Sequence, residues 1–192
     1  MKPLRRRHRI RGFTLIELLS VVAVLAILAL VAAPSFGEFL SKRRVDGVTS
    51  ELVTDLQYAR SEAVSRNEAV RLTFGTDCYV IHRALVPSSS ATVATCDRAS
   101  KSITPAAAEI KTVQLAVGNP LTIDPAVAFF EFDPVRGMAQ NDLSPPAAGT
   151  VDVRSTTGTA WRLRAVLTMM GRVATCSPGG TGYFGGYSND CS

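Results

Sequence analysis

Few residues of this sequence have the types and spacing that catalysis requires. Only two histidines occur, His8 in the basic amino terminus and His82 in a segment of alternating polar and apolar residues. The acidic residues are scattered singly, and the sequence contains no G-x-S-x-G, no H-E-x-x-H and no phosphate-binding glycine loop. General acid–base catalysis would depend on His82 alone, and its strand position favours a packing or surface role. We expect no enzyme, no cofactor and no metal site.

The four cysteines are a second set of reactive residues: Cys78, Cys96, Cys176 and Cys191. They do not form the close pairs that are typical of zinc sites, and disulfides are the default interpretation. Four cysteines allow three pairings. We favour Cys78 with Cys96 and Cys176 with Cys191, because each pair closes a short loop rich in serine, proline or glycine. Such disulfides require an oxidising compartment.

Arginines near the carboxyl end are the third set. The chain has a net charge of +5, but its first twelve residues hold six basic residues and no acid, and the remaining 15 basic and 16 acidic residues sum to −1. Bulk charge therefore gives no support to nucleic-acid binding, and only a local patch could. The candidate patch comprises Arg154, Arg162, Arg164 and Arg172, with the aromatic residues Tyr183, Phe184 and Tyr187 in a glycine-rich tail. Its alternatives are a double-stranded DNA contact and an ordinary solvated strand face.

A charge-free run of twenty residues, 18–37, is long enough to span a bilayer as a helix. A basic cluster precedes it, so the positive-inside rule places the amino terminus in the cytoplasm and the residues beyond about 42 outside it. The alternative is a cleaved secretory signal ending in the small residues at 31–33, although Pro34 follows them directly.

Glu17 borders the run. A carboxylate in a bilayer is costly unless paired, which marks Glu17 as functional, whereas the simpler alternative is a favourable position at a helix amino end.

Residues 11–19, RGFTLIELL, resemble the processing site of type IV pilins and of the pseudopilins of type II secretion. The resemblance implies cleavage after Gly12 by a membrane prepilin peptidase and methylation of the new amine of Phe13. It also implies that Glu17 meets the terminal amine of a neighbouring subunit during assembly. A simple membrane-anchored module would instead keep an unprocessed amino terminus.

Apolar residues continue at helical spacing beyond the membrane run, at positions 45, 48, 52, 56, 59 and 63. We predict one helix from residue 13 to about residue 67, whose first half is a membrane anchor and whose second half is a spine under the rest of the chain. Pro34 lacks an amide proton and is expected to kink or locally melt this helix. The break is either a tolerated irregularity or, as the resemblance implies, a feature that lets the subunit pack in a filament.

Short runs separated by turn residues follow the helix, at 70–74, 78–85, 110–117, 126–132, 151–154, 161–168 and 172–176. They predict a mainly antiparallel sheet domain against the helix, and hence an α+β fold. Residues 56–67, with FDPVRG at 132–137 and GRV at 171–173, resemble the GspH/FimT branch: pseudopilin H of type II secretion and the minor pilins FimT and FimU. Some FimT proteins bind DNA through a Gly-Arg-x-Arg motif, but here Ala174 replaces its second arginine.

These observations together predict a cleaved cytoplasmic leader (1–12), an inner-membrane helical segment (13–41) and a periplasmic pilin-like domain (42–192) with a disulfide-closed tail. The favoured function is a minor pilin that enters or primes a type IV pilus, near its tip. The alternatives are pseudopilin H of type II secretion and a DNA-receptor minor pilin of natural transformation. Expected partners are other minor pilins and the major pilin, or pseudopilins, with the prepilin peptidase, the inner-membrane assembly platform and the membrane itself.

Overall fold

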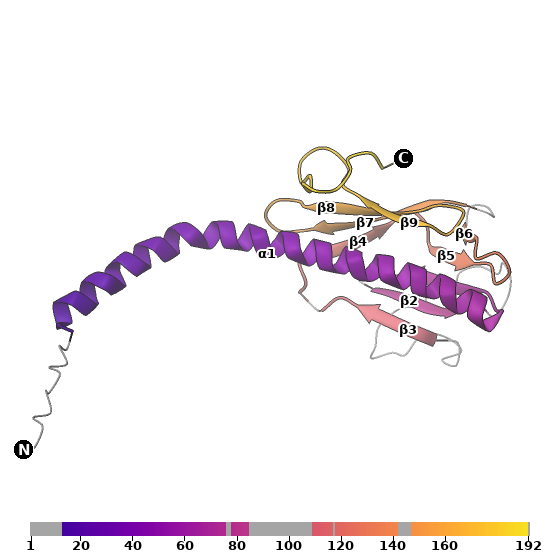
Figure 1. Ribbon diagram of the computed structural model, residues 1–192, viewed down its shortest axis with the longest axis horizontal. Coiled ribbons are helices and arrows are strands. Elements are labelled where there is room, and N and C mark those ends of the chain that lie inside the picture. The colour runs from indigo at the N-terminus through magenta and orange to yellow at the C-terminus, as the bar shows by residue number, and fades with distance from the viewer. Residues whose placement is uncertain (1–12, 76–77, 85–108, 117, 142–146, 192) are drawn as a thin grey trace, which may run out of the picture. The chain divides into compact units, whose positions relative to one another are not determined.

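The computed structural model describes residues 13–75, 78–84, 109–116, 118–141 and 147–191, and for residues 31–34 it describes the backbone alone. The chain divides into two compact units, Met1–Phe39 and Leu40–Ser192. A single helix, α1 (Leu15–Arg66), contributes to both units. In the second unit, the carboxyl-terminal part of α1 lies along the strands (Figure 1).

Both ends of α1 are capped by their own sequence. Thr14 precedes the helix, and its hydroxyl oxygen accepts a hydrogen bond from the Glu17 amide at 3.3 Å. At the other end, Asn67 adopts a left-handed conformation with φ of 53°. The amides of Asn67 and Glu68 then donate to carbonyls of the last helical turn, which is the Schellman arrangement. The predicted helix therefore agrees with α1 to within two residues at each end.

The described strands form two antiparallel sheets. The five-stranded sheet has the order β3-β2-β1-β5-β6 and consists of β1 (Val70–Phe74), β2 (Cys78–Arg83), β3 (Glu109–Gln114), β5 (Phe129–Phe132) and β6 (Ala139–Asn141). The four-stranded sheet has the order β4-β7-β8-β9 and consists of β4 (Leu121–Pro125), β7 (Gly149–Ser155), β8 (Arg162–Leu167) and β9 (Val173–Cys176). A helix packed on antiparallel sheets confirms the predicted α+β class.

Two strands were absent from the prediction, and one is shorter than predicted. β4 and β6 were not expected, and β5 begins at Phe129, three residues later than the run at 126–132. β4 contains Asp124 and Pro125, residue types that disfavour strands, and β6 has only three residues. Pairing with a neighbouring strand creates both: β4 aligns with β7 along its full length, and β6 aligns with β5.

One hydrophobic core joins the helix to both sheets. The helix face predicted at positions 45, 52, 56, 59 and 63 is at most 1% exposed, while Val48 is partly buried at its margin. The five-stranded sheet contributes Phe130 and Phe132, and the four-stranded sheet contributes Leu163 and Leu167, all fully buried. The core thus fixes the turns at the strand ends relative to the second half of α1.

Candidate assembly and arginine sites

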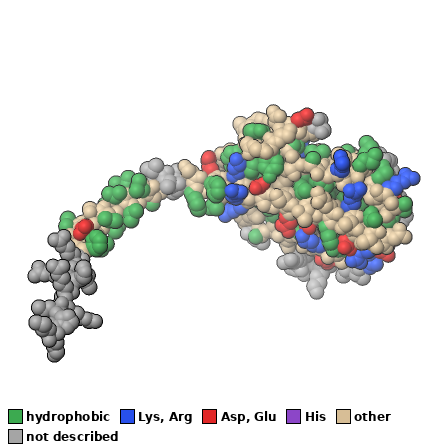
Figure 2. All heavy atoms as spheres, in the orientation of Figure 1, with side chains coloured by type: hydrophobic (Ala, Val, Ile, Leu, Met, Phe, Trp, Pro, Cys, Tyr) green, Lys and Arg blue, Asp and Glu red, His purple; other side chains and the backbone are tan. Residues whose placement is uncertain are grey.

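The amino-terminal part of α1 presents apolar side chains on every side. Between residues 13 and 30 its large apolar side chains are 49–82% exposed, and Figure 2 shows them along the first half of the helix. Glu17 is an exposed acid in the first turn, where its charge suits the helix dipole. Gly12, the expected cleavage position, lies outside the described residues. A helix that is apolar all round needs lipid or other helices around it.

Taken singly, no helix in the described part of the chain is both long and apolar enough to cross a membrane. Two segments of α1, Leu15–Leu30 and Ser35–Arg66, meet the criteria of length and composition only as a pair with a bend between them. The bend falls at residues 31–34, which include Pro34. The side chain of Pro34 is outside the described residues, so its role as a helix break remains a prediction.

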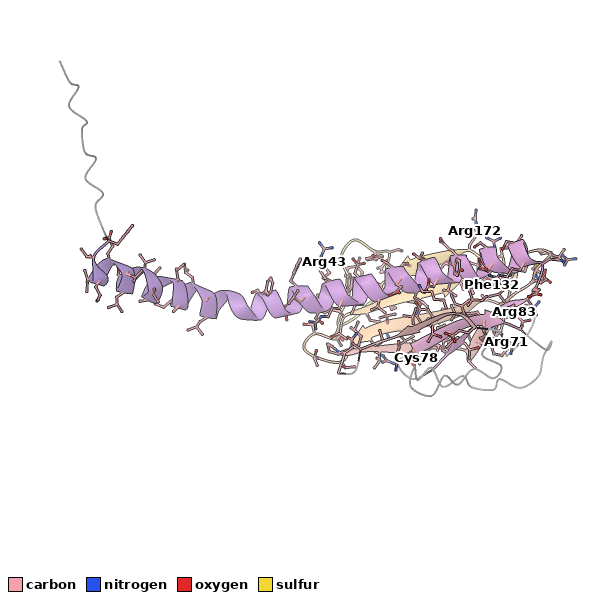
Figure 3. All side chains as sticks on the ribbon, turned by 90° about the horizontal axis from the view of Figure 1, so that it is seen from below. Arg43, Arg71, Cys78, Arg83, Phe132 and Arg172 are labelled. Atoms are coloured by element: carbon pink, nitrogen blue, oxygen red, sulfur yellow. A yellow bond between two sulfur atoms is a disulfide. The ribbon has the colours of Figure 1, made fainter. Side chains whose placement is uncertain are left out.

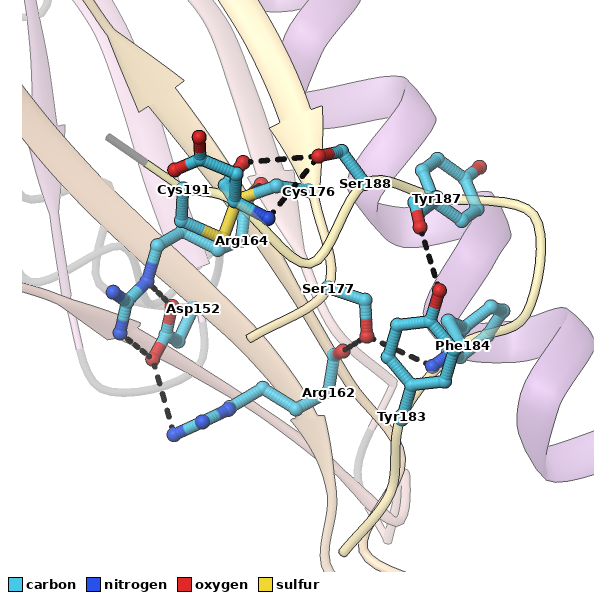
Figure 4. Close-up of a disulfide and its surroundings, with 11 residues drawn as sticks. Asp152, Arg162, Arg164, Cys176, Ser177, Tyr183, Phe184, Tyr187, Ser188 and Cys191 are labelled. Atoms are coloured by element: carbon cyan, nitrogen blue, oxygen red, sulfur yellow. Dashed lines mark hydrogen bonds and ion pairs between the residues drawn. A yellow bond between two sulfur atoms is a disulfide. The ribbon is translucent and has the colours of Figure 1, made fainter. Parts of the chain in front are cut away.

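β4, β7 and β8 bring three of the four candidate arginines onto one face together with two aspartates. Arg164 donates from Nε and Nη2 to the carboxylate of Asp152 at 2.6 and 2.9 Å, and Arg162 lies 3.8 Å from the same carboxylate (Figure 4). Asp152 stands opposite Arg164 in the strand register, and its hydrogen bond raises the pKa of Arg164. Arg154 forms an ion pair with Asp124 of β4. Two neighbouring aspartates therefore offset half of the positive charge of the predicted basic patch.

The other parts of the predicted DNA interface lie apart from these arginines. Arg172 lies in the turn between β8 and β9. Arg162 begins β8, whereas Arg172 follows the opposite end of that strand, and its side chain points away from the domain (Figure 3). Phe184 is buried, Tyr187 is half-buried, and Tyr183 is 42% exposed. The rings of Phe184 and Tyr187 belong to the core and its margin, and DNA contact by this region stays a prediction.

Of the two predicted disulfides, one lies within the described residues. Cys176 is bonded to Cys191 across a separation of fifteen residues (Figure 4), as the loop composition predicted. Cys78 is also disulfide-bonded. Cys96, its expected partner, lies outside the described residues, and that pairing remains a prediction.

The tail closed by this disulfide contacts the start of the second half of α1. The Lys42 ammonium lies 4.8 Å from the ring centre of Phe184 and 5.2 Å from that of Trp161. The Tyr187 hydroxyl donates a hydrogen bond to Asp46 at 2.5 Å. Two consecutive turns of α1 are thereby bound to the end of the chain, an arrangement that sequence analysis did not foresee.

Sequence analysis also missed the junction where its three quoted motifs meet. Arg60, from the motif at 56–67, donates from Nε to the carbonyl oxygen of Gly137 at 3.0 Å. Gly137 ends the FDPVRG turn and Gly171 begins the GRV turn, with φ of 61° and 73°. A Cβ on Gly171 would lie 2.5 Å from the Gly137 carbonyl oxygen. The motifs therefore describe one junction between α1 and the turns of both sheets.

A buried polar cluster fastens α1 to the five-stranded sheet. Asp55, 4% exposed, accepts a hydrogen bond from the Tyr79 hydroxyl at 2.8 Å and from the Lys111 ammonium at 2.7 Å. Burial, together with the bond to Asp55, raises the pKa of Tyr79 well above its ordinary value. Each buried charge has a partner, as a stable core requires. This cluster locks the orientation of the helix on the sheet.

His82 has the surroundings of a structural histidine. Its Nδ1 donates to the Arg83 carbonyl oxygen at 3.1 Å, and its Nε2 accepts from the Thr73 hydroxyl at 2.9 Å. Burial lowers the pKa of His82, which favours this neutral form. Both ring nitrogens thus form hydrogen bonds within the domain, in agreement with the expected packing role of His82.

A long amino-terminal helix with an apolar first half, packed on antiparallel sheets, defines a pilin-like protein. The sequence model of the prokaryotic N-terminal methylation motif matches residues 7–33. The model of the type II transport protein GspH matches residues 48–171, which is more than half of the chain. The chain therefore belongs to the GspH family, whose members are pilins and pseudopilins of type IV pili and type II secretion systems.

A solved minor-pilin structure shares this fold. The type IV minor pilin FimU of Pseudomonas aeruginosa (strain PAO1), crystallised in space group P21, is 21% identical, with a TM-score of 0.51 over 71% of this chain and 90% of that one. The same pilin in space group P65 is also 21% identical, with a TM-score of 0.47 over 68% and 90%. No curated protein matches the chain. At this identity the likeness to FimU concerns the fold.

Proposed function

We propose that this protein is a minor pilin that is cleaved after Gly12, methylated on Phe13 and inserted near the tip of a type IV pilus. The observation that carries the proposal is the exposed apolar surface around the first half of α1, within the segment that the methylation-motif model matches. Such a surface is stable in a membrane before assembly and among the helices of other subunits afterwards. The basic leader remains in the cytoplasm, and the domain lies in the periplasm and then in an extracytoplasmic filament.

Glu17 guides the docking step in this proposal. Its carboxylate attracts the terminal amine of a neighbouring subunit, because both charges are costly in apolar surroundings unless they pair. The sheet domain then presents its turns to adjacent minor pilins. The protein thereby acts by assembly rather than by catalysis.

Surface pilin measures this function directly. The major pilin is sheared from cells that lack the protein and from cells complemented with wild type, Glu17→Ala or Glu38→Ala. Glu38 is the matched control, since it is another exposed glutamate of α1. We expect the wild type and Glu38→Ala to restore surface pilin and Glu17→Ala to fail. Unchanged surface pilin in the deletion strain would refute the pilus proposal.

The same strains test the alternative assignment to the type II secretion system. Pseudopilin H of type II secretion has the same processing site and helical anchor, so its loss lowers secreted proteins while surface pilin stays constant. We favour the pilus because of the disulfide-closed tail that follows the part of the chain matched by the GspH model. Loss of secretion without loss of surface pilin would assign the protein to the secretion system.

DNA uptake is the second candidate function, and Arg172 is the observation in its favour. It is exposed and forms no ion pair with the described residues, whereas each of the other three arginines forms an ion pair with Asp152 or Asp124. If the arginine face contacts DNA, Asp152→Asn frees two cations and raises affinity for double-stranded DNA, with a steeper salt dependence. Arg162→Ala with Arg164→Ala lowers affinity and flattens that dependence, by about one unit of log–log slope per lost phosphate contact. Identical DNA-binding isotherms for the wild type and both variants would show that the arginine face does not contact DNA.

A further inference from the structure

Four apolar side chains from three separate elements are exposed around the glycine junction. They are Val64 of α1 (52% exposed), Val135 of the β5–β6 turn (78%), and Met169 and Met170 of the β8–β9 turn (46% and 60%). We call them the turn patch. The elements meet here because Arg60 binds the Gly137 carbonyl, and because the Ala139 amide donates to the Met169 carbonyl oxygen at 3.0 Å. The turn patch is therefore one surface and not four isolated side chains.

Hydrogen bonds within both turns hold this surface in a fixed shape. The carboxylate of Asp133 accepts hydrogen bonds from the amides of Val135 and Arg136 at 2.8 and 2.7 Å. In the other turn, the Thr168 hydroxyl accepts from the Arg172 amide at 3.2 Å. Because the backbone under the turn patch is already ordered, a partner that binds there pays little conformational entropy.

Two cations border the turn patch. Arg136 and Arg172 are exposed, and neither forms a side-chain ion pair with the described residues. Arg71, Arg154 and Arg164 are all paired with acids, so these two differ from most arginines of the domain. Figure 3 shows Arg172 directed into solvent. The surface thus has an apolar centre and two bordering cations that form no side-chain ion pair with the described residues.

We infer that the turn patch binds another subunit of the same filament. The surface of that subunit which contacts the turn patch is apolar and has an acidic rim. The chemistry favours a protein partner: methionine and arginine are enriched in protein interfaces, and exposed methionines adapt to a partner's shape. Nucleic acid would use the arginines but would leave the valines and methionines without complementary surface. The inference rests on the proposed function, because that function supplies the class of partner.

Photo-crosslinking in living cells tests both the contact and its partner. The full chain carries a benzophenone amino acid at Val135 or, as a reference, at Leu25 in the apolar half of α1. We expect Val135 to crosslink to another processed filament subunit, recognised by its own methylated amino terminus. Crosslinks from Leu25 but none from Val135 would overturn the inference and leave the proposed function intact. Absence of subunit crosslinks at both positions would overturn both, and crosslinks from Val135 to lipid or nucleic acid alone would overturn the inference.

A charge reversal tests the acidic rim. Arg136→Glu with Arg172→Glu, introduced into the Val135 crosslinking protein, is expected to lower the subunit crosslink about tenfold through like-charge repulsion. Thr157→Glu is the matched control, since it adds an exposed acid in the β7–β8 loop, at the opposite end of β8. An unchanged yield of the subunit crosslink in the arginine variant would overturn the inference that the partner's surface has an acidic rim. Equal Leu25 crosslinks in all variants show that the protein is still folded and assembled.

Discussion

Arg60 and Gly137 are joined by a hydrogen bond of 3.0 Å that ties the last turns of α1 to the β5–β6 turn. Gly171 packs against the same two residues from the β8–β9 turn, where an added Cβ would lie only 2.8 Å from Arg60 Nε. One side chain thus closes the junction between the helix and the turns of both sheets. The motifs that identify the family are the residues that allow this close approach.

Replacing Gly171 by alanine should be unusually destabilising. Gly171 has φ of 73°, and a Cβ would meet the Gly137 carbonyl oxygen at 2.5 Å. Gly158→Ala is the control, because Gly158 has φ of 67° but nothing within 4 Å of its Cβ position. We expect Gly158→Ala to lower the free energy of unfolding by about 1 kcal/mol and Gly171→Ala by about 3 kcal/mol. Urea unfolding of the full chain in detergent, followed by Trp161 fluorescence, measures both, and equal losses would exclude the clash.

Tyr79 should make the domain sensitive to alkaline pH. Burial and the hydrogen bond to Asp55 raise the pKa of Tyr79 in the folded protein, whereas in the unfolded chain it ionises near pH 10. The unfolded state therefore loses a proton that the folded state keeps, and stability falls as pH rises above about 10. Tyr79→Phe should cost about 1–2 kcal/mol at pH 7 by removing the bond to a buried carboxylate, and it should flatten the alkaline loss. Tyr58→Phe, at an exposed tyrosine, should retain the wild-type dependence on pH. Parallel alkaline slopes for wild type and Tyr79→Phe would contradict this role.

The tail disulfide should stabilise the contact between the end of the chain and α1. Cys176→Ser with Cys191→Ser removes a crosslink that closes a fifteen-residue loop, which the chain-entropy model values at about 3 kcal/mol. Mutation is preferable to a reductant, because Cys78 is also disulfide-bonded. We expect a lower midpoint of urea unfolding and faster proteolysis within residues 177–191. Tyr187→Phe, which removes only the bond to Asp46, should cost about 1 kcal/mol. A double serine variant as stable as wild type would show that packing of Phe184 and Tyr187 suffices.

Local signals predicted the elements whose own residues determine them. The spacing of apolar residues located the buried face of α1, and short runs bounded by turn residues located β1, β2 and β8. β4 could not be predicted because Asp124 and Pro125 become a strand only by pairing with β7. The partner of Arg164 was equally hidden: Asp152 is twelve residues away, and only the β7–β8 register places the two side by side. Arg60 lies 77 residues from Gly137, so no local pattern joins them.

The cap at the start of α1 gives a way to separate two roles of Glu17. Thr14 and Glu17 have the spacing of a capping box, in which either glutamate or glutamine can occupy the fourth position, and the structure shows the bond from the Glu17 amide to Thr14. Glu17→Gln therefore keeps the cap and removes the charge, whereas Thr14→Ala keeps the charge and weakens the helix start by about 1 kcal/mol. If Glu17 pairs with a neighbour's amine, its loss leaves a charge unpaired in the membrane at a cost of about 3 kcal/mol. We accordingly expect Glu17→Gln to reduce sheared surface pilin more than about tenfold and Thr14→Ala to reduce it slightly. The opposite order, with Glu17→Gln near wild type and Thr14→Ala defective, would make Glu17 a helix cap and would remove it from the docking step.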